Sequence, residues 1–163
     1  MSRVLRFVLG TCLLLAATGT DASAPAGLAA REVRAFMAEV AAASNARDVA
    51  RLSALLSPDC RIELRTEIQG HEEITLYTRT EYVAMLQSGY AAMADLADYA
   101  YHVDHQQVSL ELDPPAATVV SDVSESFTFN ARHRTTHSEE TARVERRDGR
   151  PMLVAVETLT RGD

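Results

Sequence analysis

The second half of the chain consists of long strand candidates joined by short turns. They span residues 99–112, 118–130, 134–146 and 152–160. In the second candidate, Val119, Val123 and Phe127 alternate with polar residues, which is typical of a strand with one buried face. Asp113-Pro114-Pro115 ends the first candidate because proline cannot donate to a sheet, and Asp148-Gly149 favours a type I′ hairpin before the last. Strands joined by short turns run antiparallel, so the sequence predicts a sheet of long antiparallel strands.

Two helices are predicted before any strand. Apolar residues recur at helical spacing over residues 29–44 and again over residues 49–56. Ser57-Pro58 ends the second helix, because proline lacks the amide hydrogen that a helix interior needs.

A short pair of strands and a third helix follow. From Arg61 the apolar period changes to two, and Gln69-Gly70 turns the chain into a strand over residues 73–77. Thr78 and Glu81 have the spacing of a capping box, in which two side chains satisfy free amides at a helix start. On one face this helix places Tyr82, Met85, Leu86, Met93 and Leu96.

This order of elements predicts the fold class. We expect an α+β domain in which a curved antiparallel sheet packs on three helices. Long strands bent over helices leave a cone-shaped domain, a cystatin-like α+β barrel, whose mouth is a natural pocket.

The order and two local stretches resemble a known family. Ser44-Asn45-Ala46-Arg47-Asp48 and the stretch from Thr78 to Met85 are similar to the nuclear-transport-factor-two-like superfamily, also called SnoaL-like. The resemblance covers roughly Ala29 to Thr160. It implies a conical pocket and dimerisation through the open sheet face, here along residues 134–146. It also implies relatives among isomerases, dehydratases, epoxide hydrolases and polyketide cyclases, beside members with no activity.

The resemblance also places the acid–base residues of the isomerase-like members. A tyrosine in the first helix and an aspartate in the first strand correspond here to Val40 and Leu64, which are both apolar. A third carboxylate falls near Glu140 or Thr141. The resemblance therefore implies that this chain has no base facing the substrate carbon, as the isomerase mechanism would require.

Two glutamates lie on predicted core faces. Glu125 shares a face with Val123, and Glu140 shares one with Ala142. A carboxylate there is costly unless it is paired or lines a cavity, so each either enters the pocket or meets solvent or an arginine such as Arg132 or Arg134. The predicted ligand-binding residues are Leu64, Tyr82, Ser121, Glu125, Phe127 and Glu140.

His102 and Asp104 lie where the apolar phase of the 99–112 strand changes. The change predicts a β-bulge, a device that often re-aims side chains near sites. The two residues either form a base with its orienting carboxylate or cover the sheet rim. His133 and His137 are four residues apart, which on a strand separates their rings by about 13 Å, so we expect no metal site. The sequence has no glycine-rich phosphate loop, and we expect no cofactor.

The first residues read as a secretory signal peptide over residues 1–24. Arg3 and Arg6 precede the apolar run from Phe7 to Ala17, and Ala22-Ser23-Ala24 offers a cleavage site. The run is too short to span a bilayer, although a retained anchor is the alternative. We therefore expect export to the periplasm or the exterior, with residues 25–163 as a single domain in which Cys60 has no cysteine to pair with.

The net charge limits the classes of binding partner that we expect. The net charge is −7 and there is no lysine, which disfavours nucleic acid, disfavours an anionic membrane surface and excludes Schiff-base chemistry. The leading hypothesis is an exported domain that binds a small apolar ligand or a protein partner without catalysis. A homodimer is a further expectation from the resemblance. The alternative is an isomerase-, dehydratase- or hydrolase-type enzyme with Glu125 or Glu140 as base and His102 assisting.

Overall fold

Helices and strands follow one another in the predicted order. The computed structural model describes residues 27–92, 97–129 and 131–162; the predicted signal peptide and the helix residues Met93 and Leu96 lie outside them. The elements are α1 (Ala30–Asn45), α2 (Val49–Leu55), β1 (Leu56–Ile68), β2 (His71–Thr78), α3 (Arg79–Ala92), β3 (Ala97–Leu112), β4 (Pro115–Phe129), β5 (Arg132–Arg147) and β6 (Arg150–Gly162).

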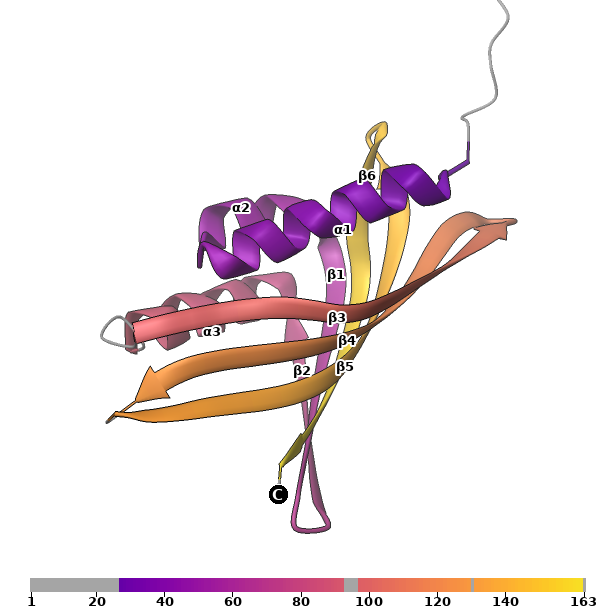
Figure 1. The fold of residues 1–163 in the computed structure, drawn as a ribbon. Coiled ribbons are helices and arrows are strands. Elements are labelled where there is room, and N and C mark those ends of the chain that lie inside the picture. Colours follow the sequence, from indigo (N-terminus) through magenta and orange to yellow (C-terminus); the bar gives the residue numbers. More distant parts are fainter. Residues whose placement is uncertain (1–26, 93–96, 130, 163) are drawn as a thin grey trace, which may run out of the picture.

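The strands form one curved sheet that does not close on itself (Figure 1). Its order is β2-β1-β6-β5-β4-β3. The three helices lie along one side of the curve, so the predicted α+β fold with a curved sheet on three helices is confirmed. Consecutive strands are antiparallel as expected, whereas β1 and β6 run parallel and make the sheet mixed. The turn argument does not reach this pair, because its members are far apart in sequence.

Local turn chemistry is confirmed at three places. The Thr78 amide and hydroxyl both donate to Glu81 Oε2 at 2.8 Å, which is the predicted capping box. Asp148 and Gly149 have φ angles of 49° and 80°, as a type I′ turn requires. In β3 the register with β4 slips between Val103 and His105, which is the predicted bulge.

The boundary between α2 and β1 differs from the prediction. Leu56 belongs to β1 rather than to the second helix, and its ψ angle is 133°. The residue before a proline avoids helical geometry, so Ser57 is extended and the helix ends one residue earlier than predicted. The register of β1 with β6 is irregular between Leu56 and Arg61, and this irregularity hides the strand period before Arg61.

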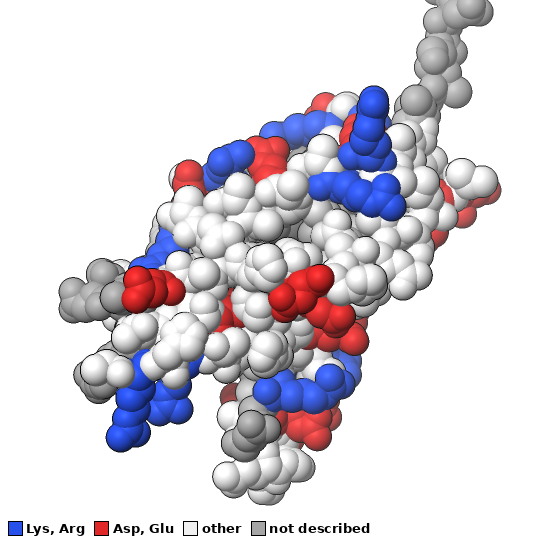
Figure 2. Space-filling model, viewed as in Figure 1, with Lys and Arg blue, Asp and Glu red and all other residues white. Residues whose placement is uncertain are grey.

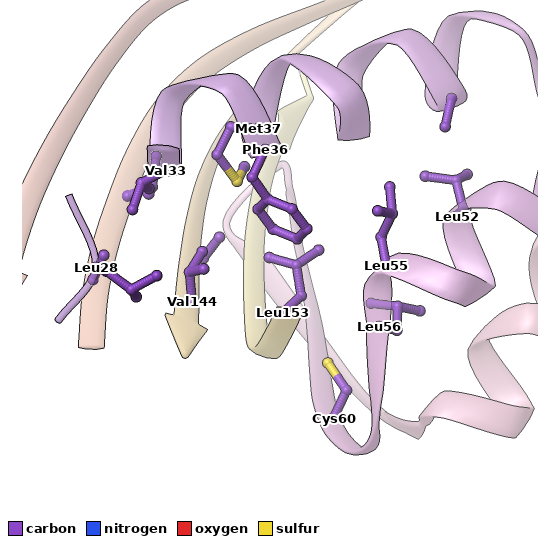
Figure 3. Close-up of a cluster of buried hydrophobic side chains, with 14 of the residues drawn as sticks. Leu28, Val33, Phe36, Met37, Leu52, Leu55, Leu56, Cys60, Val144 and Leu153 are labelled. Atoms are coloured by element: carbon purple, nitrogen blue, oxygen red, sulfur yellow. The ribbon is translucent and has the colours of Figure 1, made fainter. Parts of the chain in front are cut away.

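The packed core occupies one end of the fold. Side chains from α1, α2, β1, β4, β5 and β6 meet there, and those labelled in Figure 3 include Val33, Phe36, Leu55, Val144 and Leu153. The described residues of α3 include none that is fully buried, and Tyr82 and Leu86 only partly cover the core. The sheet is therefore less tightly covered beneath α3. No helix in the described part of the chain is long and apolar enough to cross a membrane.

Candidate functional site

Two adjacent hollows lie between the helices and the concave face of the sheet. The inner one has a volume of about 80 Å³, and its lining includes Val40, Tyr90 and Tyr101. The outer one has a volume of about 200 Å³. Tyr82, Glu140 and Thr158 line both, so the two compartments adjoin at these residues.

Glu140 on β5 is paired with Tyr101 on β3. The Tyr101 hydroxyl donates to Glu140 Oε2 at 2.9 Å. Burial raises the pKa of the Glu140 carboxyl; the hydrogen bond from Tyr101 opposes that rise, and the nearby Glu125 carboxylate adds to it. Burial and the Glu140 carboxylate also raise the pKa of the Tyr101 phenol, so the phenol remains a proton donor at neutral pH.

Glu125 on β4 has a similar partner. The Tyr99 hydroxyl donates to Glu125 Oε1 at 2.7 Å. Burial first, and then this hydrogen bond, raise the pKa of the Tyr99 phenol. The Tyr99 ring lies 6.4 Å from the Tyr90 ring in an edge-to-face arrangement, and the Arg47 guanidinium lies 4.5 Å from its centre. Tyrosine hydroxyls, and not the arginines considered from the sequence, are thus the partners of both carboxylates.

Asn45, at the end of α1, holds Tyr101 in place. Its Nδ2 donates to the Tyr101 carbonyl at 2.6 Å, and its Oδ1 accepts from the Tyr101 amide at 2.8 Å. Because β3 is an edge strand, these backbone groups have no strand partner on that side, and the side-chain amide replaces one. Three residues later, Asp48 accepts from the Arg51 amide at 2.9 Å and caps α2. Sequence reasoning noted this Asn–Asp motif but not the contact with β3.

The predicted ligand-binding residues divide into two groups. Leu64, Glu125 and Glu140 line the outer compartment together with Tyr82. Two others lie on the same face of β4 but line neither compartment. These are Ser121, which is buried and accepts from Gln106 Nε2 at 3.4 Å, and Phe127, which is half-buried.

Binding of the two glutamates by Tyr99 and Tyr101 was not predicted from the sequence. Their equal parity with Val103 in the sequence placed both on the inner face, and this was the available signal.

His102 and Asp104 form a pair on the opposite face of the sheet. Their Nε2 and Oδ1 atoms are 3.6 Å apart, and the His102 side chain is 74% exposed. His102 is paired with Ser124, whereas Tyr101 is paired with Glu125, and successive side chains on a strand point to opposite faces. The suggestion that His102 assists either glutamate is therefore not supported by the geometry.

A groove on this outer face is lined by the acidic residues Asp104, Asp122 and Glu139, together with His137 and Arg161. Figure 2 shows acidic and basic side chains interspersed over the visible face of the molecule. Within residues 27–92, 97–129 and 131–162, no group of histidine, cysteine and carboxylate side chains has an arrangement that would hold a metal ion.

Cys60 is a free thiol in the core. Burial raises its pKa to about 12, and the Asp59 carboxylate adds to the rise. A thiolate is the nucleophilic form of cysteine, so this residue is not a candidate nucleophile at neutral pH.

Comparisons with known proteins agree on the fold. No protein-family model matches the sequence, and no curated protein matches it. Among solved structures, a nuclear-transport-factor-two-like protein with a cystatin-like fold from Novosphingobium aromaticivorans is similar, with 19% identity and a TM-score of 0.60 over 80% of both chains. The chain has the nuclear-transport-factor-two-like fold. The resemblance seen in the sequence is thereby confirmed.

Two further solved structures that are similar to this chain have more specific names. ActVI-ORFA from Streptomyces coelicolor has 18% identity and a TM-score of 0.60, over 80% of this chain and 95% of its own. A type 2 hexachlorocyclohexane dehydrochlorinase has 13% identity and a TM-score of 0.58, over 80% and 83%. Identities this low establish the fold alone, so the chemistry must come from the residues of the cavity.

Proposed function

We propose that this chain binds a small, mainly apolar molecule in the compartments between its helices and sheet, without catalysing a reaction on it. The observation that supports the proposal is that two positions in the lining of the compartments are apolar. Val40 lines the inner compartment and Leu64 lines the outer one, where the isomerase-like members would have a tyrosine and an aspartate. Both positions thus offer apolar surface to a ligand and no proton-transferring group.

The remaining polar groups suit binding. Glu125 and Glu140 each accept from a tyrosine hydroxyl, so a ligand meets ordered acceptors within an aromatic wall. Ligand pockets are commonly mainly apolar, with a few fixed polar groups that set orientation.

The test is binding of a neutral apolar probe, indole, followed by methyl and amide NMR shifts. We expect the shifts to cluster at residues of the two compartments. Val40→Phe, which fills the inner compartment, should reduce them, whereas Ile74→Phe, on exposed β2, should leave them unchanged. Shifts scattered over the surface, or unaffected by Val40→Phe, would refute the proposal.

An acid–base enzyme is the second candidate, and the position of Glu140 favours it. A general base works best when its pKa lies near the operating pH, and burial moves the pKa of Glu140 upward in that direction. One similar structure is, by its name, a dehydrochlorinase, which supports an elimination of this kind. Turnover of a chlorinated or hydroxylated ring compound that Glu140→Gln abolishes and Glu139→Gln preserves would favour the enzyme.

We further propose that the domain is exported and dimeric. The features that support this are the signal-peptide pattern of residues 1–24 and the broad open face of the sheet. Terminal sequencing of protein recovered from outside the cytoplasm should begin at Pro25, and light scattering should give twice the chain mass. An uncleaved terminus, or a monomer at high concentration, would refute the respective part.

A further inference from the structure

Acidic side chains outnumber basic ones in the lining of the outer compartment. Glu125 and Glu140 both line the outer one, and its basic side chain among the described residues is Arg65. The Arg65 guanidinium is bound to Glu63 and lies 3.8 Å from Glu72, so those two carboxylates already compensate its charge. No other basic side chain in the described part of the chain lines either compartment; Arg47 lies outside both linings, with its guanidinium 4.5 Å from the centre of the Tyr99 ring.

Each of these carboxylates also keeps an oxygen for a ligand. Tyr99 donates to Oε1 of Glu125 and Tyr101 donates to Oε2 of Glu140. A carboxylate offers about four lone-pair sites, so one phenol leaves most of them free to accept. Burying a negative charge without a cation is costly, and a positive group placed between the glutamates would relieve that cost.

The aromatic lining favours the same kind of group. The Tyr82 ring borders both compartments and the Tyr90 ring borders the inner one. Aromatic faces attract organic cations, most strongly where water is excluded. The outer compartment of about 200 Å³ exceeds the ~150 Å³ cavity that admits benzene in other proteins. A single ring with a short side chain is thus the appropriate size.

We propose that the ligand of this site is a small organic cation, a protonated amine on an apolar or aromatic group, held between Glu125 and Glu140. The inference rests on the proposed binding function and specifies its ligand class. The ammonium donates to the free oxygens of the two carboxylates, while the apolar part lies against Leu64, Val40 and the Tyr82 ring.

Proton exchange on binding is a consequence. Burial and the neighbouring Glu125 hold the pKa of Glu140 above its usual range. An ammonium at the site favours the ionised form, so binding releases a proton where Glu140 is partly protonated. The other titratable groups near Glu140 are Tyr82, Tyr90, Tyr101 and Glu125. Burial raises the pKa of each of these phenols, so the phenols do not titrate below neutral pH.

The experiment compares matched probes by calorimetry with the purified protein at about pH 8, where the amine is charged. The probes are 2-phenylethylamine, its neutral counterpart 2-phenylethanol, and the anion phenylacetate. We expect the amine to bind about 10- to 100-fold more tightly than the alcohol, the range of a charge-assisted hydrogen bond, and the anion most weakly.

Variants locate the effect. Glu140→Gln should bring the amine to within about threefold of the alcohol, and Glu125→Gln should reduce the preference as well. Glu139→Gln is the matched control, because Glu139 is adjacent to Glu140 on β5 and carries the same carboxyl group on the opposite face of the sheet. It should keep the full preference. Thermal unfolding of each variant verifies that it is folded.

The outcomes separate the two proposals. If the alcohol binds as tightly as the amine, or Glu140→Gln and Glu125→Gln both keep the preference, the cation inference is overturned while binding stands. If none of the probes binds and indole also leaves the compartment signals unchanged, the proposed binding function itself is refuted.

Discussion

Replacing Asn45 with alanine should loosen the edge strand that carries both cavity tyrosines. The change removes two hydrogen bonds, of 2.6 and 2.8 Å, between the Asn45 side chain and the backbone of Tyr101. Each such bond contributes about 1 kcal/mol net. Alanine returns roughly 0.5 kcal/mol because it is the better helix former at the end of α1. We therefore expect the free energy of unfolding to fall by about 1–2 kcal/mol, since water reaches part of this exposed contact.

Asn45→Asp sharpens the test. Aspartate keeps the acceptor for the Tyr101 amide but places a negative oxygen against the Tyr101 carbonyl, where the asparagine nitrogen donates. It should therefore destabilise more than alanine at neutral pH. Only the protonated acid donates, so the folded state raises the pKa of this aspartate and its stability falls as pH rises from about 4. On acidification the aspartate variant should approach the wild type.

Urea denaturation measures both variants, and amide hydrogen exchange at Tyr101 reports the contact directly. We expect faster exchange at Tyr101 in both. If alanine and aspartate fall within about 0.3 kcal/mol of the wild type at neutral pH, or exchange at Tyr101 is unchanged, the side chain does not support β3 as argued.

Glu140→Gln should stabilise the protein, because the native carboxyl is harder to ionise than the unfolded one. The free energy of unfolding of the wild type should therefore fall as the pH rises from the ordinary carboxyl value of 4.5 through the raised native pKa of Glu140. Urea unfolding should show that the advantage of Glu140→Gln over the wild type grows over this range. A constant advantage would contradict the assignment. Thr78→Ala should cost about 1 kcal/mol of unfolding free energy and Thr78→Ser much less, since serine preserves the cap; equal losses would argue against it. Cys60, with its pKa at about 12, should react with a thiol reagent only at the rate of unfolding, and prompt labelling of native protein would show that the thiol is accessible.

Local signals in the sequence predicted much of the fold. The Thr78–Glu81 cap, the Asp148-Gly149 hairpin and the bulge after Val103 each depend on a few adjacent residues, and all three are present. The inward direction of Glu125 and Glu140 followed from strand parity in the same way. The parity of His102 against Tyr101 also held the information that they lie on opposite faces.

Contacts between distant segments were not predictable by these means. The parallel pairing of β1 with β6 joins residues that no turn connects. Asn45 reaches Tyr101 across 56 positions, and nothing in the adjacent residues indicates its partner. The identity of the carboxylate partners depends on the register between β3, β4 and β5, which a slip at the bulge shifts by one residue.

The central place of β6 bears on when this protein acquires its structure. Its neighbours are β1 and β5, so β6, which follows the other described strands along the chain, completes the middle of the sheet when it pairs. Until then, β1 and β5 each present a bare edge, and Leu153 is absent from the apolar cluster it completes. The parallel pairing of β6 with β1 joins segments that are far apart in the sequence, and chains with such high contact order acquire their structure slowly.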